Sequence, residues 1–489
     1  MYLKRTVFLV VGLSKSGVGI AGLLLQKGAK CYVYDDNECD RVKANAADLV
    51  KKGAIEVGKT EVFALLRKID AVVLSPGVAI DHEIPLAAKK LGKRITGELE
   101  LASSFCCAPI IAVTGTNGKT TTCTMIDAVL KKAKLNSVLC GNVGTPLSSL
   151  ENELTDDDIV VVEASSFQLE TVRSFTPHIA IITNITPDHL SRHYNMDNYV
   201  YVKSKILANL TETEYAVLCY DDPLVRNLKE KTRGKVVYFS TKEEVNGAYV
   251  SDGKIYYKGK YITDLNTLPI SGEHNTYNAL ACLCSAMIIG VSVEDVVEAF
   301  KCFKGVKHRI QFVKSVNGVD YYNDSKATNV DATVKAVATM TKPTVLIVGG
   351  KDKGLDFGCL FDGIKGSNVK AVVATGESAF RIAESAKKSE FKNISMTEDF
   401  ELAVYLASKT AKSGDAVLLS PACSSFDRFT DFEQRGDAFI KLVDELGKRI
   451  RKFKAAPSGG NRERGYPSPC FGNSAFVNRA GIRIFRKPI

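Results

Sequence analysis

The sequence predicts an α/β protein of three domains built mainly on parallel sheets. Short apolar runs rich in Val and Ile alternate with amphipathic helical patterns along almost the whole chain. Continuous apolar runs are typical of strands buried on both faces, and strands separated by helices form parallel sheets. A chain of 489 residues exceeds what one core supports, which indicates about three domains.

The domain order follows from where the strand patterns restart. We expect an N-terminal Rossmann-like domain over residues 1–95 and a central sheet of the P-loop ATPase type over residues 96–304. A C-terminal Rossmann-like domain follows over residues 305–450, and residues 451–489 form a basic tail.

The net charge of +10 lies entirely at the end of the chain. Residues 448–489 hold eleven Lys and Arg and a single acid, Glu463, so residues 1–447 are formally neutral. A neutral body does not attract nucleic acid nonspecifically. The tail is rich in Gly, Pro, Ser and Arg and is expected to be disordered; an electrostatic anchor is the alternative reading.

The composition also indicates the cellular compartment in which the protein works. No apolar segment approaches the roughly 20 residues that a membrane span needs. The apolar run over residues 1–12 leads into a glycine turn and carries no signal cleavage site. The 13 cysteines are scattered without zinc-site spacing, which favours a reducing compartment. We therefore expect a cytoplasmic monomer without a membrane or nucleic-acid partner.

The first domain opens with a strand over 6–13, a glycine turn, a helix from Gly17 and a strand over 31–35. Its turn loosely resembles a dinucleotide fingerprint, which predicts a crevice for a nucleotide diphosphate. A tight turn without a ligand is the alternative. Ser75-Pro76-Gly77 follows a strand over 71–74 and would line the same crevice.

The second domain opens with a strand from Ile110 that ends in Gly115-Thr116-Asn117-Gly118-Lys119-Thr120-Thr121, before a helical pattern over 122–132. Glycines let the backbone approach phosphate oxygens, the helix N-terminus attracts anions, and Lys119 adds a cation. Thr120 stands where such loops hold Mg²⁺. Only two residues separate the glycines, fewer than in the general P-loop, so an ordinary strand-to-helix turn is the competing interpretation.

Three further residues of this domain are candidates for the same site. Glu163 ends a strand over 158–164, one strand from the P-loop, where a second Mg²⁺ contact would lie. His189 follows a strand over 178–185, although imidazole is an uncommon Mg²⁺ ligand. Lys203 lies on an amphipathic stretch beyond it. Their ordinary roles would be a helix cap, a surface histidine and a solvated lysine.

The third domain carries polar loops after three apolar strands. The loops are residues 323–329, residues 349–353 and residues 420–425. Loops that follow parallel strands converge on one edge of a sheet, and charges of both signs there suit anion recognition. Each loop alone could equally be a capped surface turn.

Together these motifs resemble the Mur ligases, ATP-dependent amide-forming enzymes of peptidoglycan precursor synthesis. The resemblance rests on the P-loop and on the segments Ser75–Gly77, 141–144, 163–170, 323–329, 420–427 and 432–436. Within the family, the likeness is to the members that join D-glutamate to UDP-N-acetylmuramoyl-L-alanine. It covers roughly residues 4–446 and implies a role in cell wall biogenesis, cell shape and cell division.

The resemblance implies roles at the matching positions. Catalysis would involve Lys119, Lys203, His189 and Lys326. ATP would contact Gly115, Thr116, Asn117, Gly118, Lys119, Thr120, Thr121, Arg309 and Asp324. Two Mg²⁺ ions would be held by Thr120, Glu163, His189 and a carbamylated Lys203. The UDP-substrate would contact Gly12, Ser14, Ser16, Gly17, Asp35, Asp36, Ser75 and Asn142. D-glutamate would contact Thr328, Lys353, Ser425 and Phe432.

One departure and three rival functions stay open. The family's His-Arg-x-Glu reads His308-Arg309-Ile310-Gln311 here, which puts any role of that carboxylate in doubt. A sister Mur ligase or folylpolyglutamate synthase would use another amino acid or acceptor. A nicotinamide oxidoreductase would explain the N-terminal turn but not the P-loop. A non-catalytic nucleotide-binding module would bind ATP without turnover.

Overall fold

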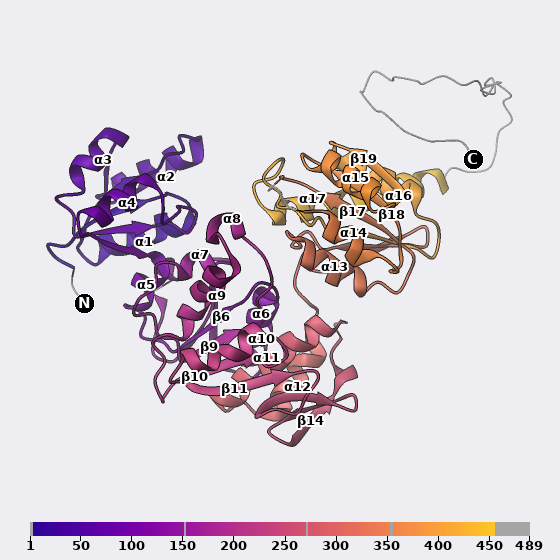
Figure 1. Cartoon of the computed structure of the whole chain (residues 1–489), viewed down its shortest axis with the longest axis horizontal. Helices are drawn as coiled ribbons and strands as arrows, with labels where there is room; N and C mark the ends of the chain where they lie inside the picture. The colour runs from indigo at the N-terminus through magenta and orange to yellow at the C-terminus, as the bar shows by residue number, and fades with distance from the viewer. Residues whose placement is uncertain (1–2, 151–152, 270–271, 353–355, 455–489) are drawn as a thin grey trace. The chain divides into compact units, whose positions relative to one another are not determined.

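The computed structural model describes residues 3–150, 153–269, 272–352 and 356–454 (Figure 1). It confirms the α/β class, with three sheets that are mostly parallel. The chain divides into two compact units, Met1–Lys304 and Gly305–Ile489. The first unit holds two of the sheets and the second unit holds the third.

The first sheet has five parallel strands in the order β3-β2-β1-β4-β5, a Rossmann-like arrangement. The strands are β1 (Val7–Val11), β2 (Lys30–Tyr34), β3 (Ile55–Glu56), β4 (Ala71–Leu74) and β5 (Arg94–Gly97). The helices are α1 (Lys15–Gln26), α2 (Asp40–Lys51), α3 (Lys59–Leu65), α4 (Glu83–Lys90) and α5 (Glu98–Ser103). Because β1 lies between β2 and β4, the loops after these three strands share one edge.

The second sheet has nine strands in the order β14-β13-β12-β11-β10-β9-β6-β8-β7. The strands are β6 (Ile110–Thr114), β7 (Asn136–Gly141), β8 (Asp158–Glu163), β9 (Ile179–Ile182), β10 (Tyr215–Cys219), β11 (Lys235–Ser240), β12 (Gly247–Ser251), β13 (Lys254–Tyr257) and β14 (Lys260–Asp264). The helices are α6 (Lys119–Lys132), α7 (Ser166–Leu169), α8 (Leu190–His193), α9 (Met196–Ser204), α10 (Pro223–Arg226), α11 (Glu273–Ile289) and α12 (Val293–Cys302). β6 and β9 are buried along their whole length, as a sheet covered on both faces requires.

The third sheet has six strands in the order β15-β16-β20-β17-β18-β19, all parallel except the β15–β16 pair. The strands are β15 (Gln311–Val316), β16 (Val319–Asn323), β17 (Thr344–Gly349), β18 (Val369–Thr375), β19 (Ile394–Thr397) and β20 (Ala416–Leu419). The helices are α13 (Val330–Ala338), α14 (Gly358–Ile364), α15 (Ala379–Lys388), α16 (Phe400–Thr410) and α17 (Phe432–Lys454). Two separate apolar clusters form its core. One packs α13, α14 and α15, and the other packs α16 and α17.

The element ends differ in detail from the sequence expectations. Helix α6 begins at Lys119, three residues before the predicted helical pattern, so the P-loop lysine is the first residue of the helix. Helix α17 continues to Lys454, four residues into the predicted tail, and residues 455–489 lie outside the described residues. Among the described residues, no helix is both long and apolar enough to cross a membrane.

Candidate active site

The P-loop lies between the two loops that sequence reasoning assigned to the same site. Its strand β6 pairs in parallel with β8, which ends at Glu163, and with β9, which leads to His189. Gly115 and Gly118 have positive φ angles of 145° and 87°. A Cβ at Gly115 would lie 2.0 Å from Thr183 Oγ1, so this position requires glycine on two counts.

Two lysines meet at the carbonyl of Gly115. Lys119 Nζ donates to Gly115 O at 3.0 Å and to Thr116 O at 2.7 Å. Lys203 Nζ donates to the same Gly115 O at 2.6 Å and lies 4.8 Å from the centroid of the Tyr199 ring. Lys203 is 1% exposed. Burial, and secondarily the charge of Lys119, hold the pKa of Lys203 well below its usual value.

Hard oxygen donors lie on the other side of the loop. Thr120 Oγ1 donates to Glu163 Oε2 at 2.5 Å, and Asn142 Nδ2 donates to Glu163 Oε1 at 2.9 Å. Glu163 is 2% exposed. A hydroxyl and a carboxylate oxygen suit Mg²⁺, so the residues present fit that ion. Asn142, predicted to contact the UDP-substrate, thus lies against the candidate metal ligand in the central domain.

His189 is exposed and has a left-handed backbone, with φ 54°. Its ring packs edge-on against Phe167 with 4.9 Å between ring centroids, and Nε2 lies 3.6 Å from Asp188 Oδ2. Among the described residues, the sole cluster of three His, Cys, Asp or Glu side chains with donor atoms within 4.8 Å is Asp36, His82 and Glu83. The predicted magnesium site differs from such a cluster because two of its four ligands are a threonine and a lysine.

The structure brings several of the residues predicted for the N-terminal crevice close together. Gly12 has φ 92°, and a Cβ there would lie 2.7 Å from Ser75 Cβ. A Cβ at Gly17 would lie 1.8 Å from Gly12 O, so both positions require glycine for close packing. Ser14 Oγ and Ser75 Oγ are 2.8 Å apart. Ser16 lies in the first turn of α1, half-buried.

The two carboxylates after β2 take different partners. Asp35 Oδ2 accepts a hydrogen bond from Leu13 N at 2.6 Å, which braces the glycine turn. Asp36 Oδ1 accepts from Tyr34 OH at 2.6 Å, and its Oδ2 lies 2.9 Å from His82 Nε2. Asp35 is thus held to the turn, and Asp36 to the start of α4.

The three polar loops of the C-terminal domain meet as predicted, because β16, β20 and β17 are neighbours in the sheet. Ser420 Oγ donates to Asp324 Oδ2 at 2.8 Å, and Lys351 N donates to Ser424 O at 2.9 Å. Burial raises the pKa of Asp324 to about 6, against the lowering effect of Arg309 nearby.

Of the candidate D-glutamate residues, Phe432 is the first residue of α17. Lys326 Nζ lies 4.4 Å from the centroid of the Phe432 ring. Ser425 is 2% exposed, and Thr328 is half-buried in the loop that follows β16. Lys353 lies outside the described residues.

Sequence reasoning assigned no role to several polar residues that build these loops. Asn184 Oδ1 accepts from Asn117 N at 2.9 Å. A Cβ at Gly118 would lie 2.3 Å from Asn278 Oδ1 on α11. Arg435 is 2% exposed and donates to Ser325 O at 2.8 Å and Cys423 O at 3.1 Å. For Asn278, the available signal was a pair of asparagines three residues apart, just before the apolar part of α11.

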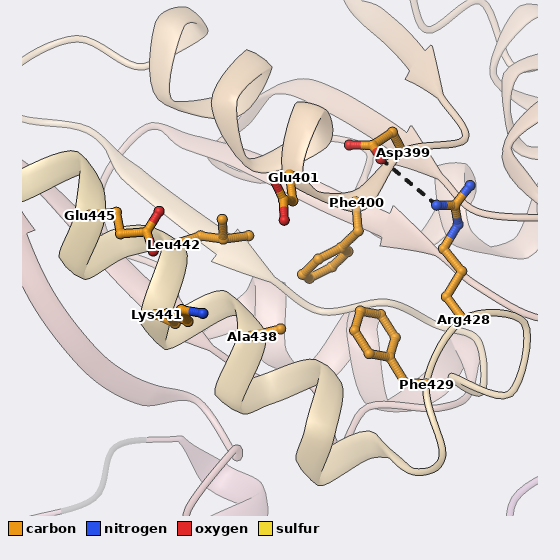
Figure 2. A pocket seen from close by; sticks show the side chains of 9 residues that line it. All are labelled: Asp399, Phe400, Glu401, Arg428, Phe429, Ala438, Lys441, Leu442 and Glu445. Carbon is orange, nitrogen blue, oxygen red and sulfur yellow. Dashed lines mark ion pairs between the residues drawn. The ribbon is translucent and has the colours of Figure 1, made fainter. Parts of the chain in front are cut away.

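A cavity of about 420 Å³ lies on the second unit (Figure 2). Figure 2 shows Phe400 and Phe429 facing each other; their ring centroids are 5.2 Å apart. Arg428 Nη1 lies 3.8 Å from Asp399 Oδ2 at one side. None of the residues that line this cavity belongs to the predicted site, so we do not assign the active site to it.

Family models cover most of the chain. The Mur ligase MurD-like N-terminal domain matches residues 6–97, the Mur ligase middle domain matches 113–286, and the Mur ligase glutamate ligase domain matches 308–423.

Individual relatives agree with these domain models. A UDP-N-acetylmuramoylalanine–D-glutamate ligase of Thermoanaerobacter sp. (strain X514) is 43% identical over 455 residues, 91% of this chain and 100% of the relative. The enzyme of the same name from Pelotomaculum thermopropionicum is 42% identical over 456 residues, 91% of this chain and 98% of the relative.

Solved structures share the three-domain fold. The UDP-N-acetylmuramate-alanine ligase MurC of Thermotoga maritima gives a TM-score of 0.56 at 22% identity, covering 92% of this chain and 99% of that one. The MurF ligase of Thermotoga maritima in complex with ADP gives 0.55 at 16% identity, covering 93% and 96%. The chain therefore belongs to the Mur ligase family.

Proposed function

We propose that the protein is an ATP-dependent ligase that joins D-glutamate to UDP-N-acetylmuramoyl-L-alanine, in cytoplasmic synthesis of peptidoglycan precursors. The observation that carries this proposal is the P-loop with its two lysines and its Thr120–Glu163 pair, in a chain 43% identical to ligases of that name. Identity over 91% of the chain favours this amino acid over those of the sister ligases.

The three domains divide the substrates in this proposal. Residues 1–95 hold the UDP portion at the crevice of Gly12, Ser14 and Ser75. Residues 96–304 hold ATP on the P-loop. Residues 305–450 hold D-glutamate among the loops after β16, β17 and β20, with Arg309 and Asp324 toward the nucleotide. The enzyme acts as a monomer.

The first chemical step is phosphoryl transfer. A carboxylate oxygen of the alanyl group attacks the γ-phosphorus of ATP. The bond between that phosphorus and the β–γ bridging oxygen breaks, so that an acyl phosphate forms and ADP is released. Lys119 lowers the repulsion between the carboxylate and the triphosphate, and the amides at the start of α6 orient the phosphates. Catalysis thus consists mainly of positioning and charge neutralisation.

Two Mg²⁺ ions held by Thr120, Glu163, His189 and Lys203 would supply further neutralisation of phosphate charge when bound. Thr120 and Glu163 are already in contact at 2.5 Å. Lys203 contributes as a carbamate in this proposal: its amine nitrogen bonds to the carbon of CO₂, and a proton leaves to solvent. The product offers anionic oxygens, which are the ligands that Mg²⁺ prefers.

The second step forms the amide. The neutral amine of D-glutamate attacks the acyl carbon, the bond between that carbon and the phosphate oxygen breaks, and the proton lost by the nitrogen leaves with the phosphate. Lys326, Thr328, Lys353, Ser425 and Phe432 orient D-glutamate for this attack. The amine must arrive before water does, which requires a closed site during the reaction.

The test supplies the purified chain with UDP-N-acetylmuramoyl-L-alanine, Mg·ATP and D-glutamate, and follows phosphate release together with product mass. We expect one phosphate for each amide formed, and no product mass with L-glutamate or L-lysine. Removal of dissolved CO₂ should lower kcat, and added bicarbonate should restore it. Phosphate release that is independent of the amino acid would rule out the ligase.

A further inference from the structure

Arg192 connects the N-terminal sheet to the central sheet within the first unit. It lies in α8, three residues after His189, while its guanidinium reaches the turn that follows β4. Nη2 donates to Val78 O at 2.8 Å and to Pro76 O at 3.5 Å, and Nη1 donates to Gly77 O at 3.4 Å. One side chain of the central domain thus binds three carbonyls of a single turn in the N-terminal domain.

Glu170 fixes the guanidinium from the other side. Arg192 Nε donates to Glu170 Oε1 at 3.0 Å, and Nη2 donates to Glu170 Oε2 at 2.6 Å, a two-pronged pair. The Glu170 side chain is only 3% exposed, and that of Arg192 is 15% exposed. The guanidinium also lies 4.8 Å from the centroid of the Phe167 ring. Because Glu170 and Phe167 hold the planar Arg192 guanidinium, its orientation toward the turn is fixed.

The junction leaves the turn little room to move independently. The cavity between the turn and α7 measures about 10 Å³, roughly the space of one water molecule. On its far side, Ser75 packs against Gly12, where an added Cβ would lie 2.7 Å from Ser75 Cβ. A displacement of Arg192 would therefore reach Ser75 and the glycine turn.

We propose that Arg192 is a positioning residue that sets the turn 75–78 relative to the P-loop site. The inference rests on the proposed function, in which this turn lines the UDP crevice and the segment at His189 lies beside the phosphates. By fixing one segment to the other, Arg192 fixes where the substrate carboxylate arrives. Misplacement of a reacting group by about 1 Å can cost on the order of 100-fold in rate.

The test compares Arg192→Met, Arg192→Lys and Glu170→Gln with the matched control Arg173→Met. Arg173 is exposed and lies three residues after Glu170, so its substitution removes the same charge without touching the turn. For Arg192→Met we expect kcat/KM for the UDP-substrate to fall about 30-fold or more, with KM for ATP changed less than about twofold. For Arg192→Lys, kcat/KM for the UDP-substrate should lie between the wild-type and Arg192→Met values, because an ammonium cannot bind an acid and three carbonyls at once.

A second readout does not depend on the proposed activity. Amide hydrogen exchange across residues 75–82 of the substrate-free protein should accelerate in Arg192→Met and stay unchanged in Arg173→Met. Faster exchange without a change in kcat/KM would reduce Arg192 to a structural contact and overturn the inference. Unchanged exchange, or equal changes in KM for ATP and the UDP-substrate, would also overturn it. An inactive wild-type protein whose exchange responds as expected would instead refute the proposed function.

Discussion

The central and C-terminal domains both gather polar loops at the carboxyl ends of neighbouring parallel strands, yet they hold these loops by different means. In the central domain, one continuous segment supplies the glycines and Lys119, whose ammonium binds carbonyls three and four residues away. In the C-terminal domain, Arg435 comes from α17 and joins two of the three loops, through Ser325 and Cys423. The P-loop is locally encoded, whereas the junction of the C-terminal loops depends on tertiary contacts.

Replacing Lys119 should give the largest effect and separates chemistry from stability. We expect Lys119→Met to lower kcat by about 10³-fold, because the triphosphate loses its positioned cation, while the unfolding free energy changes by less than about 1 kcal/mol. Steady-state kinetics measure the change in kcat, and urea unfolding measures the change in unfolding free energy. A kcat within about tenfold of wild type would show that the P-loop lysine does not carry the charge in the transition state.

Replacing Arg435, in contrast to Lys119, should act mainly on stability. Its guanidinium is 2% exposed, and burial lowers its pKa to about 10. Arg435→Met leaves buried carbonyls at Ser325 and Cys423 without their donor, so the second unit should lose about 3 kcal/mol of unfolding free energy. Hydrogen exchange in β16 and β20 measures this loss unit by unit.

The control for Arg435 is Arg428→Met. Arg428 is partly exposed and lies 3.8 Å from Asp399, a surface pair whose loss should cost less than about 1 kcal/mol. If both variants lost the same stability, the loops at Ser325 and Cys423 would not depend on a buried tertiary bridge.

A fall in pH should change the unfolding free energies of the two units in opposite directions. Burial lowers the pKa of His193 to about 4, below its unfolded value of about 6.5, so the first unit loses stability as pH falls through this range. Burial raises the pKa of Asp324 to about 6, above its unfolded value of about 3.9, so the second unit loses stability as pH rises through that range.

The amplitude of each effect should be between about 1 and 3 kcal/mol, since one pKa unit corresponds to about 1.4 kcal/mol. His193→Gln and Asp324→Asn should each remove the pH dependence of one unit only. Hydrogen exchange of α9 and of β20 between pH 4 and pH 7 is the measurement. Parallel shifts in both units would contradict the assignment.

The same contrast explains how much the sequence could predict. The alternation of strands and helices and the P-loop were predictable because they depend on neighbours in the chain. The convergence of three C-terminal loops was predictable from the parallel-strand rule, and the sheet order confirms it. The contact of Lys203 with Gly115 O joins residues 88 positions apart and could be anticipated only through the family resemblance.

Some contacts carried no signal in the sequence. Arg435 lies in the segment 432–436, which carried part of the family resemblance, but nothing in the sequence indicated that its side chain is buried against two distant loops. Arg192 likewise looks like a solvated helical residue until its carbonyl partners at Pro76, Gly77 and Val78 are seen. Most of the atoms that these two arginines bind on distant segments are backbone carbonyls, which every residue has, so pattern reasoning does not reveal them.

The smallest effect should come from restoring the family's acid at Gln311. The loop before it is strained, with left-handed backbones at His308 (φ 62°) and Ile310 (φ 44°). Gln311 Oε1 accepts from His308 N at 2.9 Å, and Asp324 Oδ1 accepts from Ile310 N at 3.2 Å, so each bond braces one strained residue.

A glutamate would keep the acceptor oxygen and add charge, so Gln311→Glu should raise the unfolding free energy of the second unit by less than about 1 kcal/mol and leave kcat within about twofold. Gln311→Leu removes the acceptor and should cost about 1–2 kcal/mol. Since the bond needs an oxygen rather than a charge, we expect this chain to tolerate the departure from the family pattern. A tenfold gain in kcat for Gln311→Glu would show instead that the carboxylate serves the chemistry and that this chain works without it.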